Sequence, residues 1–182
     1  MTVREFDPFR LDVVAFAKDA GELTGHWPLA GFARIAESAA PGSPVTDAGV
    51  VTWHARGEQR QLRGGEAQIW MYVEAATRVS LECQRCLKPV EVPLQVARKF
   101  LFVHGEDAAA QLDTDTEDDV LAITRALDLR ELIEDELLLA MPIVPRHDVC
   151  PEPLVPQTDA EPIEDKPNPF AALAGLKRKN LN

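Results

Sequence analysis

Cysteine, positive charge and long apolar runs are all scarce in this sequence of 182 residues. Three cysteines are an odd number and too few for the disulfide framework of a secreted scaffold, so we expect thiols or metal ligands in a reducing compartment. No stretch approaches the roughly 20 consecutive apolar residues of a membrane span, and the first residues are polar where a signal peptide needs an apolar run. These absences predict a cytoplasmic protein without a membrane partner.

Familiar catalytic patterns are missing as well. The sequence has no phosphate-binding glycine loop, no Gly-x-Ser-x-Gly elbow and no His-Glu-x-x-His helix, and its four histidines are too scattered to indicate a general base. We therefore predict no enzymatic activity and no cofactor that a reaction would require.

Basic residues number 19 against 30 acidic ones, and the net charge of −11 repels a phosphate backbone at long range. Contact with nucleic acid would have to be local, and basic proteins are equally natural partners. Positive charge gathers in the segment predicted to form a sheet, at Arg56, Arg60, Arg63, Arg78, Arg85, Lys88, Arg98 and Lys99, while acidic residues lie mostly outside it. This asymmetry favours RNA contact, although strand faces often carry such residues without a ligand.

What is present predicts an α+β fold. Apolar residues recur with a period of two over residues 50–103, which is typical of an antiparallel β meander with turns at 64–65 and 83–89. Pro93 indicates an edge position because it cannot donate to the ladder. Helical spacing predicts two flanking N-terminal helices, one that Asp7 and Pro8 begin and a second over residues 29–38.

The second half of the chain predicts one long helix, over residues 128–141, after a solvated acidic loop at 106–119. Asp128 and Glu131 have the spacing of a capping box. Glu136 falls within the apolar stripe of this helix. A helix-edge side chain in water is the favoured interpretation there, with a partly buried carboxylate as the alternative.

Composition divides the chain into three parts. We predict a single α+β domain over residues 1–150, an extended Pro-rich acidic linker over 151–167, and a basic amphipathic tail segment over 168–182 that includes a short helix. This tail either docks on a partner or packs back on its own domain.

Cys83 and Cys86 have the two-residue spacing with which a tight turn presents two thiolates to a metal. His147 and Cys150 would complete a zinc site of three cysteines and one histidine, and such a site would pin the end of the long helix to a sheet turn. Two alternatives stay open. The cysteines are small residues at a hairpin corner, or they form a redox pair, which would be expected at a helix N-terminus rather than before Pro89 and a second strand.

Three stretches, residues 81–89, 133–148 and 166–179, resemble the YceD family of large ribosomal RNA subunit accumulation proteins, in order and over most of the chain. The resemblance implies a non-catalytic role in synthesis, processing or stability of large-subunit (23S) ribosomal RNA. The family positions that it carries onto this sequence are Cys83, Arg85, Cys86, Lys88, Pro89, Glu134, Asp135, Glu136, Pro142, Asn168, Pro169, Phe170, Leu173, Leu176 and Lys177. Some branches of the family have a cysteine-rich stretch after the long helix, where this chain offers just His147 and Cys150.

Two hypotheses for function follow. In the first, the sheet face and the basic tail contact ribosomal RNA or a pre-ribosomal particle. In the second, the chain is an adaptor whose acidic loop and linker hold a basic ribosomal protein or assembly factor, and the tail helix docks in a groove. The candidate RNA- or partner-binding residues are Arg85, Lys88, Asn168, Pro169, Phe170, Leu173, Leu176, Lys177, Arg178 and Lys179.

Overall fold

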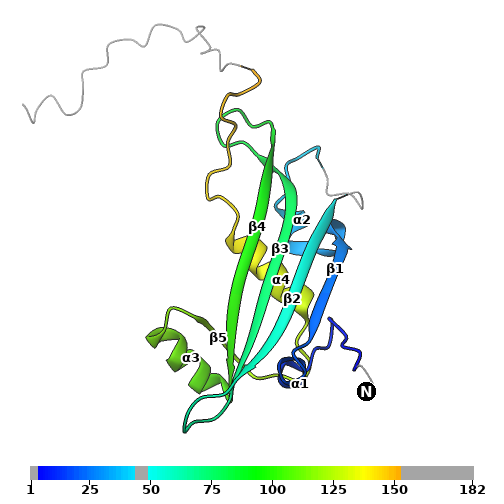
Figure 1. Cartoon of the computed structure of the whole chain (residues 1–182). Coiled ribbons are helices and arrows are strands. Elements are labelled where there is room, and N and C mark those ends of the chain that lie inside the picture. The colour runs from blue at the N-terminus through cyan, green and yellow to red at the C-terminus, as the bar shows by residue number, and fades with distance from the viewer. Residues whose placement is uncertain (1–3, 44–48, 153–182) are drawn as a thin grey trace, which may run out of the picture. The chain divides into compact units, whose positions relative to one another are not determined.

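The computed structural model describes residues 4–43 and 49–152, which form a five-stranded sheet with helices (Figure 1). The strands are β1 (Glu22–Pro28), β2 (Val50–Arg60), β3 (Gln68–Glu82), β4 (Pro89–Val103) and β5 (Asp119–Ala122), and they lie in the sheet in this order. The first four pair antiparallel, whereas β5 pairs parallel with β4. The α+β class is confirmed, but the sheet is mixed rather than purely antiparallel.

Three helices cover one face of this sheet: α1 (Val13–Lys18), α2 (Ala33–Glu37) and α4 (Leu129–Leu139). In Figure 1, α4 crosses behind the long central strands. Alternation along β3 turns Met71, Val73 and Ala75 toward these helices, which buries them. The largest fully buried side chains of this core include Leu11, Phe16, Phe32, Ile35, Met71, Leu94, Phe100, Leu129, Ile133 and Leu137.

The predicted period of two over residues 50–103 corresponds to the long strands β2, β3 and β4. Residues 69–73 and 79–81 belong to one strand, β3, whose ladder with β4 runs from Ile69 opposite Phe102 to Glu82 opposite Pro89. Pro93 lies where β4 has β3 on one side and, among the described strands, no partner on the other, since β5 pairs only from Phe100 onward. Its predicted edge position is confirmed.

The acidic segment after β4 is not the solvated loop that its composition predicted. It forms α3 (Glu106–Asp115) and leads into β5. Ala109 and Val120 pack on Trp70 and Leu101, on the sheet face opposite the main core. A small satellite core therefore holds a helix whose other faces are acidic and exposed.

The N-terminal helices differ in detail from the expectation. Asp7 accepts a hydrogen bond from the backbone N–H of Phe9 in a turn, and the helix begins later, where Asp12 caps α1 through the N–H of Ala15. The predicted helix over residues 29–38 is present as a 3-10 turn, Leu29–Gly31, followed by α2. The strand β1 between them was not predicted.

The start of the long helix was predicted correctly. Asp128 caps α4 and accepts hydrogen bonds from the N–H groups of Arg130 and Glu131. Leu129, Ile133 and Leu137 are fully buried, as their spacing predicted. Glu136 is 7% exposed and accepts a hydrogen bond from Arg98 Nε at 3.1 Å, so the favoured exposed position for it was wrong.

The chain divides into two units, Met1–Cys150 and Pro151–Asn182, and all elements above belong to the first. The predicted linker and tail helix lie outside the described residues, apart from Pro151 and Glu152. None of the described helices has the length and apolar character needed to cross a membrane.

Candidate metal centre

The turn between β3 and β4 presents two cysteines, because its backbone is tied back on itself. The N–H of Cys83 donates to the carbonyl of Lys88 at 3.0 Å, and the N–H of Leu87 donates to the carbonyl of Cys83 at 2.8 Å. Leu87 closes the turn with a φ of 57°, in the left-handed region that glycine usually occupies. Cys83 and Cys86 thereby face the same side of a short, tightly closed turn.

The segment that follows α4 is attached to this turn. The N–H of Gln84 donates to the carbonyl of Pro145 at 2.8 Å. The guanidinium of Arg85 donates to the carbonyl of His147 at 2.7 Å and, from Nε, to Cys150 Sγ at 3.0 Å. Arg85, in the middle of the cysteine pair, therefore orients the second pair of candidate ligands.

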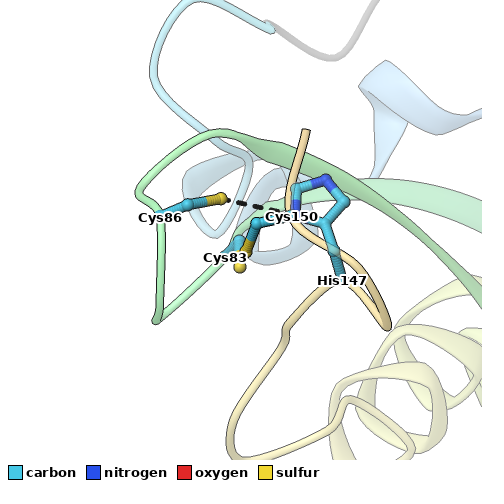
Figure 2. Close-up of side chains that lie close together, drawn as sticks. All are labelled: Cys83, Cys86, His147 and Cys150. Carbon is cyan, nitrogen blue, oxygen red and sulfur yellow. Dashed lines mark hydrogen bonds between the residues drawn. The ribbon is translucent and has the colours of Figure 1, made fainter. Parts of the chain in front are cut away.

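Four potential ligand atoms converge between these two segments: Cys83 Sγ, Cys86 Sγ, Cys150 Sγ and a ring nitrogen of His147 all lie within 4.8 Å of one another (Figure 2). Cys86 Sγ is 3.5 Å from His147 Nδ1. Cys83 is fully buried, and the other three residues are half-buried. The structure thus places all four residues of the predicted site in one cluster, which we call the cysteine–histidine group.

The orientation of His147 leaves one ring nitrogen available to the group. Nε2 lies 3.0 Å from the carbonyl oxygen of Pro89, which can only accept, so Nε2 carries the hydrogen. In the neutral ring Nδ1 then has a free lone pair, and it is Nδ1 that faces Cys86. Fixing the imidazole through its other nitrogen is typical of histidine ligands in metal proteins.

Charge is distributed unevenly over the three thiols. Burial alone would raise the pKa of Cys83, but hydrogen bonds from the backbone N–H groups of Cys86, Arg85 and His147 lower that pKa to about 5. Burial raises the pKa of Cys86 above its ordinary value. The hydrogen bond with Cys150 raises the pKa of Arg85. These hydrogen bonds therefore favour the thiolate form of Cys83, and the guanidinium of Arg85 places a cation beside Cys150.

The three acidic residues of α4 that belong to the family positions make contacts that stabilise the fold. Glu134 is 8% exposed, and its Oε1 accepts the N–H groups of Arg34 and Ile35 at the start of α2. Asp135 pairs with the same arginine at the surface, and Glu136 pairs with Arg98.

The basic residues of the sheet are largely matched by nearby acids. Arg56 and Arg60 both reach Glu58, at 3.7 and 2.8 Å, and Lys99 pairs with Asp118. Arg98 points to the helix face, where it meets Glu136. The excess of positive charge expected on this sheet is therefore reduced by ion pairs that the sequence did not predict.

The remaining predicted binding residues are only partly placed. Lys88 lies exposed in the turn between β3 and β4. The tail candidates Asn168, Pro169, Phe170, Leu173, Leu176, Lys177, Arg178 and Lys179 lie outside the described residues.

The comparisons with known proteins agree with the resemblance in the sequence. A family model described as "Large ribosomal RNA subunit accumulation protein YceD" matches residues 71–177, more than half of the chain. The chain belongs to the YceD family. It is also similar to a curated YceD protein of Haemophilus influenzae, with 30% identity over 178 residues that cover 94% of this chain and 97% of the relative. No solved structure matches it.

Within the family-matched part lie the whole cysteine–histidine group and the acidic residues of α4. Sequence reasoning missed the ion pair of Arg34 with Glu134 and the contact of Arg85 with Cys150. An arginine between two closely spaced cysteines was the available signal for the second, whereas the first joins residues 100 positions apart.

Proposed function

We propose that this chain supports the accumulation of large-subunit ribosomal RNA, through its synthesis, processing or stability, as a non-catalytic protein of the cytoplasm. The observation that carries the proposal is membership of the YceD family, together with a relative of that printed name that matches almost end to end. The closely equal lengths of the two matched chains favour a shared role for the whole protein.

The partner in this proposal is large-subunit ribosomal RNA or a pre-ribosomal particle. Lys88 lies exposed in the turn between β3 and β4, beside Arg85, whose guanidinium also binds His147 and Cys150. The sequence supplies further basic residues, Lys177, Arg178 and Lys179, in the tail. Phosphate contacts of this local kind are compatible with a net charge of −11 because screening confines long-range repulsion.

A second candidate is an adaptor that binds a basic ribosomal protein or assembly factor. It is favoured by the ion pairs on the sheet, where Glu58 and Asp118 engage Arg56, Arg60 and Lys99 and leave less positive charge for phosphate. An acidic protein attracts basic partners at long range, whereas it repels RNA.

The proposed role is non-catalytic and therefore needs no cofactor for a reaction. The cysteine–histidine group enters it as a structural element, and Zn²⁺ is the ion that its donor atoms fit. The ion pairs of Glu134 with Arg34 and of Glu136 with Arg98 are also structural, since they hold α4 to α2 and to the sheet.

The test of the proposal is the ratio of large- to small-subunit ribosomal RNA in cells that lack the gene. The gene is supplied again as the intact chain, as a form ending at Pro167, or as the Cys83→Ser/Cys86→Ser double variant. We expect the ratio to fall without the gene and to be restored by the intact chain. An unchanged ratio would refute the role. Comparing how far each of the two altered forms restores the ratio shows whether the tail or the turn contributes more to it.

The two partners are distinguished by salt and by the tail. Direct phosphate contact predicts that RNA affinity falls steeply between about 50 and 200 mM salt. An adaptor predicts instead that Phe170→Ala abolishes capture of a basic ribosomal protein and leaves RNA affinity unchanged. Leu62→Ala, in the exposed turn between β2 and β3, is the matched control.

A further inference from the structure

We propose that Cys83, Cys86 and Cys150, through Sγ, and His147, through Nδ1, bind one Zn²⁺ tetrahedrally, and that this ion clamps the segment after α4 to the turn between β3 and β4. The proposal goes beyond the role in ribosomal RNA accumulation and does not depend on it. It rests on the geometry of the group, on its surroundings and on the way in which the clamped segment is held.

The distances fit a tetrahedral ion. Zn–S bonds of about 2.3 Å and Zn–N bonds of about 2.0–2.1 Å place neighbouring ligand atoms roughly 3.6–3.8 Å apart in a tetrahedron. Cys86 Sγ and His147 Nδ1 are 3.5 Å apart, and no pair of ligand atoms is more than 4.8 Å apart. Binding of one ion therefore requires shifts of only about 1 Å in the ligand atoms that lie furthest apart.

The surroundings are those of a metal site rather than of a hairpin corner or a redox pair. A buried cysteine that only fills space has no need of the backbone N–H groups of Cys86, Arg85 and His147 around its sulfur. A disulfide would use two of the three sulfurs and leave the third beside His147 and Arg85. A metal ion uses all four groups at once, including the nitrogen that the contact with Pro89 leaves free.

Arg85 balances the charge of the proposed site. Three thiolates and one Zn²⁺ carry a net charge of −1, which the guanidinium neutralises from its position 3.0 Å from Cys150 Sγ. The same side chain holds the carbonyl of His147. Arg85 is therefore a positioning residue, and the loss of such an outer partner typically weakens metal affinity about 10- to 100-fold.

Apart from its hydrogen bonds with the turn, the clamped segment has few contacts to hold it. Its apolar side chains lie in water: Ile143 is 98% exposed and Val149 is 85% exposed. Hydrophobic burial therefore contributes little to fixing this segment. The cysteines of the β3–β4 turn, which it faces, are held by the hydrogen bonds of that turn. In a part of the chain without a core of its own, binding a metal ion contributes folding free energy directly.

The experiment measures zinc in the full chain, purified with a thiol reductant and without added chelator. Elemental analysis gives zinc per chain, and Co²⁺ exchanged for Zn²⁺ reports coordination through its absorption spectrum. We expect one zinc per chain, sulfur-to-cobalt charge-transfer bands and the intense ligand-field bands of tetrahedral Co²⁺. Absence of zinc, with no uptake of added Zn²⁺ by the reduced protein, would overturn the proposal, as would an octahedral Co²⁺ spectrum.

Variants locate the site. Cys150→Ser and His147→Gln should each lower zinc affinity strongly in competition with a chromophoric chelator, and Arg85→Ala should lower it about 10- to 100-fold. His104→Gln, an exposed histidine just beyond the other end of β4, is the matched control and should bind as the unaltered chain does. Circular dichroism verifies that each variant keeps its sheet and helices. Unchanged affinity in a folded Cys150→Ser variant would show that the ligands were assigned wrongly.

Discussion

Glu134 accepts a hydrogen bond at 2.8 Å from the backbone N–H of Arg34, a residue 100 positions earlier in the chain, and so supplies the start of α2 with a cap. The residue at the N-cap position itself, Phe32, has no side-chain oxygen with which to do this. Oε2 of the same carboxylate accepts from the Arg34 guanidinium at 3.2 Å. One nearly buried acid therefore joins two helices and satisfies backbone groups that α2 leaves unpaired.

Replacing Glu134 by Ala should lower the free energy of unfolding by about 1–3 kcal/mol, because the N–H groups of Arg34 and Ile35, one part-buried and one buried, lose their acceptor. Urea denaturation measures this loss. Asp135→Ala is the matched control, since Asp135 pairs with the same arginine at the surface and should cost at most about 1 kcal/mol. Equal losses in the two variants would contradict the capping role.

Glu136 should make stability depend on pH. Burial raises its pKa despite the attraction of Arg98, so the folded state binds the proton more tightly than the unfolded state does. Its stabilising contribution is present below the unfolded pKa of about 4.3 and is lost as pH rises through the folded pKa. The free energy of unfolding of Glu136→Gln, relative to the unaltered chain, should therefore increase as pH rises from this range to neutrality. A decrease over the same range would contradict the sign of the shift.

Removal of the proposed zinc should expose the segment after α4 to protease. Arg146 is a trypsin site within that segment, and we expect a chelator to accelerate cleavage there while most of the core stays folded. Cleavage at Arg63, in the turn between β2 and β3, is the internal control and should not change. If the chelator leaves the rate at Arg146 unaltered, the segment is held by something other than a metal.

Gly57 should not tolerate a side chain. A Cβ atom there would lie 2.7 Å from the carbonyl oxygen of Phe16, which is backbone and cannot rotate away. Gly57→Ala should therefore destabilise the fold by about 1–3 kcal/mol in thermal or urea unfolding. Gly65→Ala, whose Cβ would meet nothing closer than Leu62 at 3.6 Å, should leave the stability nearly unchanged.

The parts of the fold that the sequence predicted are those with strong local patterns. Asp128 caps α4 as its position suggested, and Leu129, Ile133 and Leu137 are buried as their spacing suggested. The cysteine–histidine group was also predicted as a possible metal site, because closely spaced ligand types are visible in sequence. Its assembly over more than 60 positions needed the packing of α4 on the sheet.

The elements that were missed depend on neighbours far along the chain. β1 contains Gly25 and ends at Pro28, which weaken any strand pattern, yet Gly25 is needed because a Cβ there would lie 2.7 Å from the ring of Trp53. α3 is acidic and binds the sheet through few apolar contacts, including that of Ala109 with the satellite core. The periodicity of one segment does not predict an element that is stabilised mainly by contacts with a distant strand.

The bond of Arg34 to Glu134 also sets an order in which the chain can fold. The hairpins of β2, β3 and β4 close between neighbouring segments, with a small entropic cost for each loop. α2 must instead wait for α4, which supplies its cap, and Leu11 must wait for its bridge partner Leu127. During synthesis α2 therefore remains without its cap until α4 has emerged, and the contact of α2 with α4 is a late step of folding with high contact order.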